Sequence, residues 1–354
     1  MRYTRENRSA RKPMGKAFFW AAMLCAPIAA AAVYWWIVYP NGKSTLPSRL
    51  VVGTSSSVST GLLSVAEENG FFEAEGLPVE IRRYRSAGLA LKEMLAGKIG
   101  MTGVSETPLV RAGFSRSDFR IVAVACTSSS DPKIVVRRDS GIDVPSDLAG
   151  RRIGSTRKGQ SAHFFLYLFL LKHRIPENAV AVIHDAPGAV VERLASGDLQ
   201  AAALFEPYAY RAAKRLGRNG RVFEEVGLYH KTFCLAVHPR LIDGNIGAIG
   251  KFLRALIRAE NYYQNHPESA TAMIASDLGV HPDIVESFMQ NATLTVELHS
   301  SLSAALKDQA AWMVENGLIN AASPPEFDRL IEPGPLRAID SGRVGAAFGG
   351  RPSP

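Results

Sequence analysis

The chain has 354 residues, enough for one large domain or two of ordinary size, and 47% of them are hydrophobic, as in a globular protein. The formal charge of +8 comes mainly from the N-terminus. Residues 1–16 hold six of the 41 basic and one of the 33 acidic residues, which leaves 35 basic and 32 acidic residues beyond them. This near balance excludes a strongly basic nucleic-acid-binding domain.

Residues 17–39 form an uncharged apolar segment that is long enough to cross a bilayer as a helix. Because basic flanks stay inside the cell, we predict residues 1–16 to be a cytoplasmic tail and the rest of the chain to lie on the periplasmic or extracytoplasmic face of a bacterial inner membrane. Aromatic residues at 34–36 are typical of an uncleaved anchor, whereas alanines at 29–32 are typical of a cleaved signal sequence. In both interpretations the chain after residue 39 is exported, and we favour the anchor.

Strands and helices are predicted to alternate after a polar linker at residues 40–48. The first series has expected strands at 50–52, 79–84, 99–103 and 120–126 and helices at 62–68, 88–96 and from 106 onwards. A second series begins after Asp139, with expected strands at 152–155, 179–184, 201–205, 222–225 and 233–238 and helices at 161–173, 189–195 and 208–216. This alternation predicts an α/β chain with parallel sheets and crossover helices.

After residue 238 the periodicity predicts helices alone, at 247–264, 267–278, 282–290 and 301–315. The last of these places Trp312 on an apolar face, so we expect this side chain in the core. Residues 341–354, rich in Gly, Arg and Pro, are predicted to be disordered. Two alternating series with a helical C-terminal region indicate two lobes and a cleft.

The cysteines predict neither a metal centre nor a cofactor site. Cys126 and Cys234 each lie in an apolar run and are expected to be buried free thiols, while one disulfide between them stays open as an alternative. The sequence has no CxxC motif and no cluster of His and Cys, so we expect no metal and no cofactor.

Ligands of open α/β sheets bind beyond the carboxyl ends of the strands. That rule selects the loops at 54–61, 104–108, 127–130, 157–163 and 206–208. The first three are rich in Ser and Thr, and the fourth contributes Ser161. Hydroxyl groups and free N–H groups at helix starts suit a small anion with several acceptor oxygens.

The sequence KGQSAHFF, residues 158–165, places Ser161 two residues before His163 at the start of a predicted helix. At this spacing the two side chains project to different faces, and no G-x-S-x-G elbow is present, so we predict no catalytic residue. Ser161 is either a helix cap or part of an anion site. Since Gly159 permits close approach of an anion, we favour the anion site.

A series of motifs then carries a resemblance that covers residues 49–338. The motifs are AEENGFFEAEGL (66–77), LAGKIGMTG (95–103), DLAGRRIG (147–154) and LASGDLQAAALFEPY (194–208). Together they resemble the substrate-binding proteins of ABC importers of the nitrate/sulfonate/taurine group, which are related to the pyrimidine-synthase-like fold.

The resemblance implies a two-lobed type II periplasmic-binding-protein fold, in which each lobe is a mostly parallel sheet flanked by helices. Lobe 1 is then expected to comprise residues 49–130 and 234–340, and lobe 2 residues 131–233. The implied ligand-binding residues lie in the selected loops and are Ser55, Ser56, Ser57, Ser105, Glu106, Thr107, Ser128, Ser129, Gly159, Gln160, Ser161, Ala162, His163, Glu206, Pro207 and Tyr208. Family members often have Gly-Ser-Thr where this chain has Gly-Gln-Ser at 159–161.

The implied function is capture of an anionic or zwitterionic small solute that bears an oxyanion, such as a sulfonate, taurine or nitrate. The implied partners are the permease subunits of an ABC importer and the membrane through residues 17–39, and no nucleic acid. The protein is then not an enzyme. Two alternatives stay open: a membrane-anchored ligand-sensing module, and a pyrimidine-synthase-like enzyme, whose cysteine-rich metal motif this chain lacks.

Overall fold

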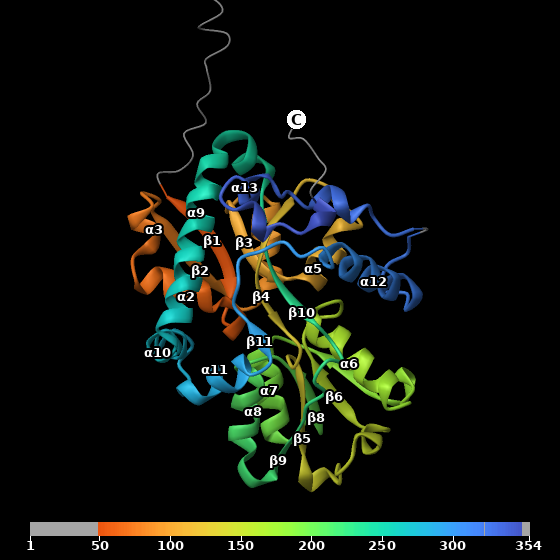
Figure 1. Ribbon diagram of the computed structural model, residues 1–354. Coiled ribbons are helices and arrows are strands. Elements are labelled where there is room, and N and C mark those ends of the chain that lie inside the picture. The colour runs from red at the N-terminus through yellow and green to blue at the C-terminus, as the bar shows by residue number, and fades with distance from the viewer. Residues whose placement is uncertain (1–48, 322, 349–354) are drawn as a thin grey trace, which may run out of the picture. The chain divides into compact units, whose positions relative to one another are not determined.

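The computed structural model describes residues 49–321 and 323–348. The predicted tail at 1–16, the anchor or signal sequence at 17–39, the linker at 40–48 and the end of the chain from residue 349 lie outside these residues. Within the described part of the chain, no helix combines the length and the apolar composition that a membrane crossing requires. The described residues form two β-sheets with helices packed against them (Figure 1).

The first sheet has six strands in the order β11-β4-β10-β3-β1-β2. Its strands are β1 Leu50–Ser55, β2 Val79–Tyr84, β3 Met101–Ser105, β4 Arg120–Ser128, β10 Lys231–Val237 and β11 Ala292–Thr293. β1, β2 and β3 are parallel, and β10 is antiparallel to both of its neighbours. β1 and β3 are buried almost throughout, as expected for strands that are covered on both faces.

The second sheet has five strands in the order β7-β6-β8-β5-β9. They are β5 Lys133–Arg137, β6 Arg152–Ser155, β7 Ala181–His184, β8 Ala201–Leu204 and β9 Gly220–Phe223. β6, β7 and β8 are parallel, whereas β5 lies antiparallel between β8 and β9. β5 was not predicted from the sequence, because the second predicted series begins only after Asp139.

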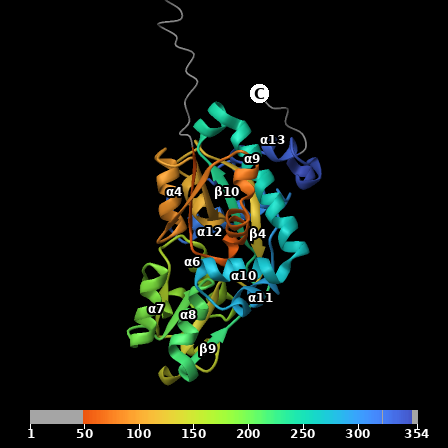
Figure 2. The same cartoon turned by 90° about the vertical axis from the view of Figure 1, so that its left-hand side faces the viewer.

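Helices pack against both sheets (Figure 2). Those that follow strands of the first sheet are α2 Gly61–Glu68, α3 Phe71–Ala74, α4 Ala87–Leu95 and α5 Glu106–Gly113, and those that follow strands of the second are α6 Ser161–Lys172, α7 Pro187–Ser196 and α8 Tyr208–Leu216. The C-terminal helices are α9 Pro239–Asn265, interrupted at Asn245, α10 Pro267–Leu278, α11 Pro282–Met289, α12 Leu302–Glu315 and α13 Gly334–Arg337.

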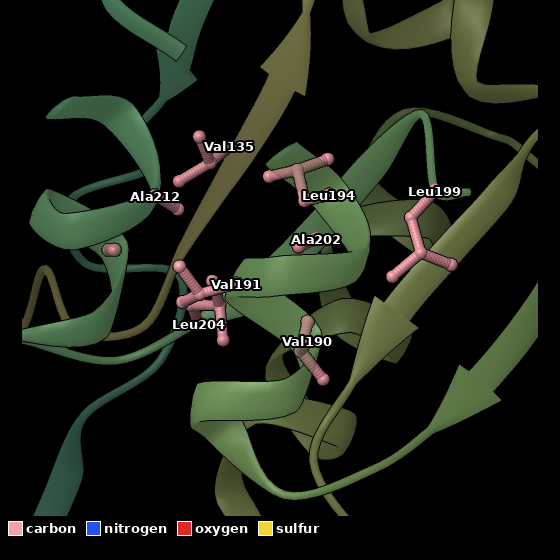
Figure 3. Close-up of a cluster of buried hydrophobic side chains, with 9 residues drawn as sticks. Val135, Val190, Val191, Leu194, Leu199, Ala202, Leu204 and Ala212 are labelled. Carbon is pink, nitrogen blue, oxygen red and sulfur yellow. The ribbon is translucent and has the colours of Figure 1, made fainter. Parts of the chain in front are cut away.

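A cluster of buried side chains holds α7 and α8 on the second sheet (Figure 3). Val190 and Leu194 of α7 pack together with Ala202 and Leu204 of β8. Gly154 in β6 lets α7 approach closely, since a methyl group at this position would lie 2.7 Å from the side chain of Val190. The sheet and the two helices therefore form one rigid support for the loops at the strand ends.

The prediction that residues 341–354 are disordered is wrong for residues 341–348. A 3₁₀ turn at Ser341–Arg343 brings the Arg343 guanidinium within 2.7 Å of the buried Glu260 carboxylate, and Val344 pairs with Leu298. Phe348 is buried at the end of this segment. The Gly- and Arg-rich composition was misleading, because Arg343 forms an ion pair with Glu260 that fixes this segment. The sequence alone does not show that these two residues lie close together.

The chain passes between the sheets twice within the described residues, at 129–132 and at 224–230. The two crossing segments lie side by side, since the N–H of Gly227 donates to the carbonyl of Ser129 at 2.7 Å. The side chains of Asp131 and Lys231, at the ends of these segments, form a buried ion pair. Both connections are therefore fixed to each other close to the carboxyl ends of the strands.

Candidate functional site

A narrow pocket of about 40 Å³ lies between residues that belong to the two sheets and their helices. This volume accommodates roughly three water-sized groups. The first sheet and its helices contribute Ser55, Ser57, Ser86, Ala87, Gly88, Ser105, Pro108, Lys231 and Phe233, and the second contributes Gln160, Ser161, Pro187 and Phe205. The pocket therefore forms where loops of both halves meet.

Four helices begin at this pocket. Ser86, Ser105 and Gln160 are the N-cap residues of α4, α5 and α6, and Pro187 is the first residue of α7. The first turn of an α-helix leaves N–H groups without intrahelical partners, and the helix dipole adds partial positive charge there. Although Pro187 and Pro108 have no N–H, the remaining first-turn N–H groups and the dipoles of the four helices provide an environment that suits an anion.

The N-cap side chains around the pocket are available for a ligand. Ser86, Ser105 and Gln160 make no side-chain hydrogen bond to their own helices. The hydroxyl of Ser86 is buried and has no hydrogen-bond partner among the described residues. By contrast, the Ser57 hydroxyl accepts from the N–H of Ser59 at 3.3 Å. A buried hydroxyl without a partner is uncommon, and an anion in the pocket would provide one for Ser86.

The start of α6 is held in place by His163. Gly159, with a φ of +79°, turns its N–H towards Nδ1 of His163 at 3.2 Å. The imidazole packs against His184 and Trp312 at centroid distances of 4.8 and 5.6 Å. Burial, with the nearby His184 and Lys158, lowers the pKa of His163 to about 4. His163 is therefore neutral at pH 7 and positions the helix start rather than lining the pocket.

Residues from the first half of the chain meet α6 across the pocket. A methyl group at Gly88 of α4 would lie 2.6 Å from Nε2 of Gln160. A methyl group at Gly159 would lie 2.9 Å from the guanidinium of Arg111 on α5. The two halves are thus already in close contact beside the pocket.

Lys231 brings a positive charge to the pocket. Its side chain is 5% exposed, pairs with the fully buried carboxylate of Asp131, and places Nζ 5.2 Å from the centre of the Phe205 ring. Lys231 was not among the site residues predicted from the sequence. The available signal was a lysine at the polar start of the apolar stretch KTFCLAV, which is β10.

Five of the predicted site residues line the pocket: Ser55, Ser57, Ser105, Gln160 and Ser161. Ser56, Gly159, Ala162 and His163 are adjacent in sequence to these residues but do not line it. The other lining residues besides Lys231 were not among the predicted site residues, namely Ser86, Ala87, Gly88, Pro108, Pro187, Phe205 and Phe233. Ser86 precedes a predicted helix just as Ser105 does, so the same helix-start pattern could have identified it.

Glu106 and Thr107, also predicted, lie behind the pocket. The buried carboxylate of Glu106 accepts hydrogen bonds from Nε2 of Gln309 at 2.7 Å, from the N–H of Thr232 at 2.9 Å and from the hydroxyl of Tyr229. Burial raises the pKa of Glu106, and the pKa of Tyr229 is raised well above its usual value by burial and by Glu106. Glu106 therefore ties α5 to α12 and to the second crossing segment.

Neither the serines at 128–129 nor residues 206–208 line the pocket. The Ser129 hydroxyl donates to the carbonyl of Asn291 at 3.3 Å, and the Ser128 hydroxyl accepts from the N–H of Ser130 at 3.4 Å. These bonds engage both hydroxyls with backbone groups of the protein.

Glu206 is buried, lies 3.6 Å from Nζ of Lys133 and accepts from the N–H of Tyr210 at 3.0 Å. Burial raises the pKa of Glu206. Pro207 precedes α8, and Tyr208 packs edge-on against Phe205, with ring centroids 5.3 Å apart. These residues support Phe205, which does line the pocket.

The thiols are buried and lie away from the pocket lining. Cys126 and Cys234 are free, and burial raises the pKa of Cys126 to about 12 and that of Cys234 well above its usual value. The expectation of buried free thiols is therefore confirmed, and the alternative of a disulfide between them is not. Among residues 49–321 and 323–348, no group of three or more His, Cys, Asp or Glu side chains is arranged to hold a metal ion.

Comparison with curated proteins identifies relatives over most of the chain. The protein named "Putative aliphatic sulfonates-binding protein" of Bacillus subtilis (strain 168) is 24% identical over 248 residues, which are 68% of this chain and 73% of that protein. The taurine-binding periplasmic protein of Escherichia coli (strain K12) is 22% identical over 281 residues, which are 72% of this chain and 83% of that protein.

Solved structures with the same fold include the alkanesulfonate-binding protein SsuA from Xanthomonas axonopodis pv. citri bound to MOPS. It has a TM-score of 0.71 and 18% identity, over 81% of this chain and 99% of that chain. The desulfurization enzyme DSZB has a TM-score of 0.60 and 18% identity, over 83% of this chain and 100% of that chain. These similarities confirm the expected two-lobed α/β fold.

A family model described as NMT1/THI5 like matches residues 57–270, which is more than half of the chain. The matched segment contains β2 to β10, both crossing segments, and most of the residues that line the pocket. The chain therefore belongs to the NMT1/THI5-like family.

Proposed function

We propose that this protein is the extracytoplasmic solute-binding component of an ABC importer and that it captures a small solute with a sulfonate group. The observation that carries this proposal is the convergence of four helix starts on one pocket that also contains Lys231. The relatives named for aliphatic sulfonates and taurine support the same solute class.

A sulfonate matches the hydrogen-bonding character of the pocket. Among the described residues, the lining offers serine hydroxyls, one ammonium group and no carboxylate, and the first turns of α4, α5 and α6 add N–H groups. A sulfonate has three acceptor oxygens and no proton at neutral pH, so each oxygen can receive donors without a competing O–H group. A phosphate monoester that keeps a proton has an O–H group that needs an acceptor. The donor-rich lining therefore favours the sulfonate.

Capture is proposed to occur by closure of two lobes about the crossing segments. The expected boundary moves by three residues, because residues 231–233 belong to β10 of the first sheet, so lobe 1 would comprise residues 49–130 and 231–340, and lobe 2 residues 131–230. The close approach of Gly88 to Gln160 beside the pocket supports contact between the lobes in the closed form. A hinge at two short connections is a common arrangement for such closure, in which no covalent bond of the solute changes.

A catalytic role is not favoured by the side chains at the pocket, although DSZB shares the fold. In the part of the chain that the structure describes, the lining contains no Cys, His, Asp or Glu, and Nδ1 of His163 already accepts the N–H of Gly159, so Ser161 has no histidine or carboxylate base in the lining. A nucleophilic serine needs such a base. The geometry therefore supports binding rather than turnover.

Export to the extracytoplasmic side is proposed from residues 17–39, with the N-terminal segment acting as an anchor. The periplasmic relative supports this location. Fractionation of cells tests the anchor: the full-length chain should remain with membranes after a high-salt wash. Recovery of a soluble form that begins near residue 32 would instead identify a cleaved signal sequence.

A thermal-shift experiment on the full-length protein tests the solute class. Methanesulfonate, ethanesulfonate, nitrate and sulfate are compared, and a bound solute at about 100 times its Kd should add about 2.7 kcal/mol to the unfolding free energy. The proposal expects the largest shift from a sulfonate. No shift with any sulfonate, together with a clear shift from another solute, would overturn it.

A further inference from the structure

The charges around the pocket are unevenly placed. Of the described residues that line it, Lys231 is the one with a formal charge. The Asp131 carboxylate that pairs with Lys231 has no exposed surface and is not part of the lining. A solute in the pocket would therefore meet the ammonium group of Lys231 but no carboxylate.

Three buried carboxylates near the pocket, those of Asp131, Glu206 and Glu106, are engaged in bonds behind the lining. Asp131 accepts from Lys231 and also from the N–H of Glu206 at 2.8 Å. Glu206 lies 3.6 Å from Nζ of Lys133, and Glu106 accepts three hydrogen bonds. Moving any of these groups to face a solute would leave a buried partner unsatisfied, which is strongly unfavourable.

We propose, on the basis of the function proposed above, that Lys231 makes the pocket selective for sulfonates without a cationic group. An ammonium group on the solute would have no carboxylate partner and would be repelled by Lys231 at short range in a partly desolvated site. Taurine and other aminoalkanesulfonates are therefore poor ligands, and simple or hydroxylated short-chain alkanesulfonates are good ones.

The apolar part of the lining agrees with this selectivity. Pro108, Pro187, Phe205 and Phe233 surround the pocket beside its hydroxyl groups. These side chains suit a short carbon chain and offer nothing that would solvate an ammonium group. The Phe205 ring faces the ammonium group of Lys231. Its cation–π contact is therefore made to the protein and not to an ammonium group of the solute.

Isothermal titration of the full-length protein with isethionate and taurine tests the inference. The two solutes have nearly the same size, and the hydroxyl group of isethionate stands where taurine has its ammonium group. We expect isethionate to bind at least about tenfold more tightly, the ratio that about 1.4 kcal/mol gives. Ethanesulfonate, which has neither group, should resemble isethionate.

A double variant tests the role of Lys231 itself. Lys231→Gln with Asp131→Asn removes both charges and keeps a neutral hydrogen-bonding pair, so neither partner is left as a lone buried charge. The preference for isethionate over taurine should fall to within about threefold, which corresponds to about 0.7 kcal/mol. Lys98→Gln is the control, because Lys98 is a lysine that is ion-paired with Glu93 and does not line the pocket. This control should keep the wild-type preference.

The outcomes separate the two proposals. If no sulfonate binds to the wild-type protein, the proposed function fails, and the inference fails with it. If isethionate and taurine bind equally well, only the selectivity is wrong. If the double variant keeps the wild-type preference, Lys231 is not its cause. Should the double variant not fold, Lys231→Arg provides the second measurement, because it retains the charge and must retain the preference.

Discussion

The indole ring of Trp312 packs against the ring of Phe164 with their centroids 4.6 Å apart, which joins α12 to α6. The two helices lie close to each other in Figure 1. Trp312 also contacts Tyr167, one turn further along α6, at a centroid distance of 5.5 Å. It is buried, as the sequence predicted, but its aromatic neighbours belong to a helix on the second sheet. Since α6 begins at the pocket, a movement between the two halves would change the surroundings of the Trp312 indole.

Trp312 is therefore expected to report solute binding, because any change in the separation of α6 and α12 alters the surroundings of the indole. It is also the only tryptophan after residue 36. Its emission should change when a bound sulfonate shifts the lobes, and Trp312→Phe should abolish that change. The variant should lose about 1–3 kcal/mol of unfolding free energy, as is usual for a smaller side chain in a core. Retention of the full fluorescence response in the variant would contradict the placement.

Replacing Ser161 by Asp should abolish most of the solute affinity without unfolding the protein. The new carboxylate stands at the first residue of α6, where the helix dipole favours a negative charge but an anionic solute would be repelled. We expect at least about a hundredfold weaker binding, or about 2.7 kcal/mol, in a titration with ethanesulfonate. Ser301→Asp is the matched control, since Ser301 is the exposed N-cap of α12, away from the pocket lining. Equal affinities for the two variants would move the anion site elsewhere.

His163 should make stability fall as the solution becomes acidic. Its pKa is about 4 in the folded protein, against 6.5 for a free histidine, so the unfolded state binds the proton more readily. The neutral form contributes full stability above pH 6.5, and up to about 3 kcal/mol of it is lost as the pH falls from 6.5 through 4. Glu106 and Glu206, whose pKa values are raised by burial, act in the opposite direction above pH 4.5.

Chemical denaturation at several pH values isolates the histidine effect. His163→Gln retains an acceptor for the N–H of Gly159 but has no titratable group, so the loss of stability between pH 6.5 and 4 should be smaller than in the wild type. The same substitution at the exposed His281 should leave the slope unchanged. An unaltered slope in His163→Gln would show that another group controls the acid transition.

Glu106 should be essential for the stability of the second crossing segment. Glu106→Leu leaves the hydroxyl of Tyr229, the N–H of Thr232 and the amide of Gln309 without their acceptor. We expect the unfolding free energy measured by urea denaturation to fall by about 3 kcal/mol or more, since buried donors without an acceptor strongly destabilise the folded state. Glu106→Gln keeps one acceptor oxygen and should lose less. A loss below about 1 kcal/mol in the leucine variant would contradict this role.

Local sequence patterns predicted much of this protein. The alternation of strands and helices indicated an α/β fold, and the polar residues before apolar helices located Ser105 and Ser161, because a helix start depends on residues that are close in sequence. The same pattern identified Gln160, which lines the pocket from α6. The local sequence was sufficient to predict these pocket residues, because each of them belongs to a single helix start.

Only the tertiary structure decided which charges meet. Lys231 reaches the pocket because β10 returns to the first sheet and brings it to Asp131, a residue 100 positions earlier. Glu106 looked like a ligand contact in a Ser/Thr-rich loop, yet folding surrounds it with donors from Tyr229 and Gln309. Arg343 is ordered because Glu260 lies beside it. Ion pairs between distant residues depend on burial and on strand pairing, and no local pattern encodes the partner. The sequence by itself thus determined most of the elements and the helix-start chemistry, while packing across the two sheets brought Lys231 to the pocket, as the one charged side chain among the described residues that line it.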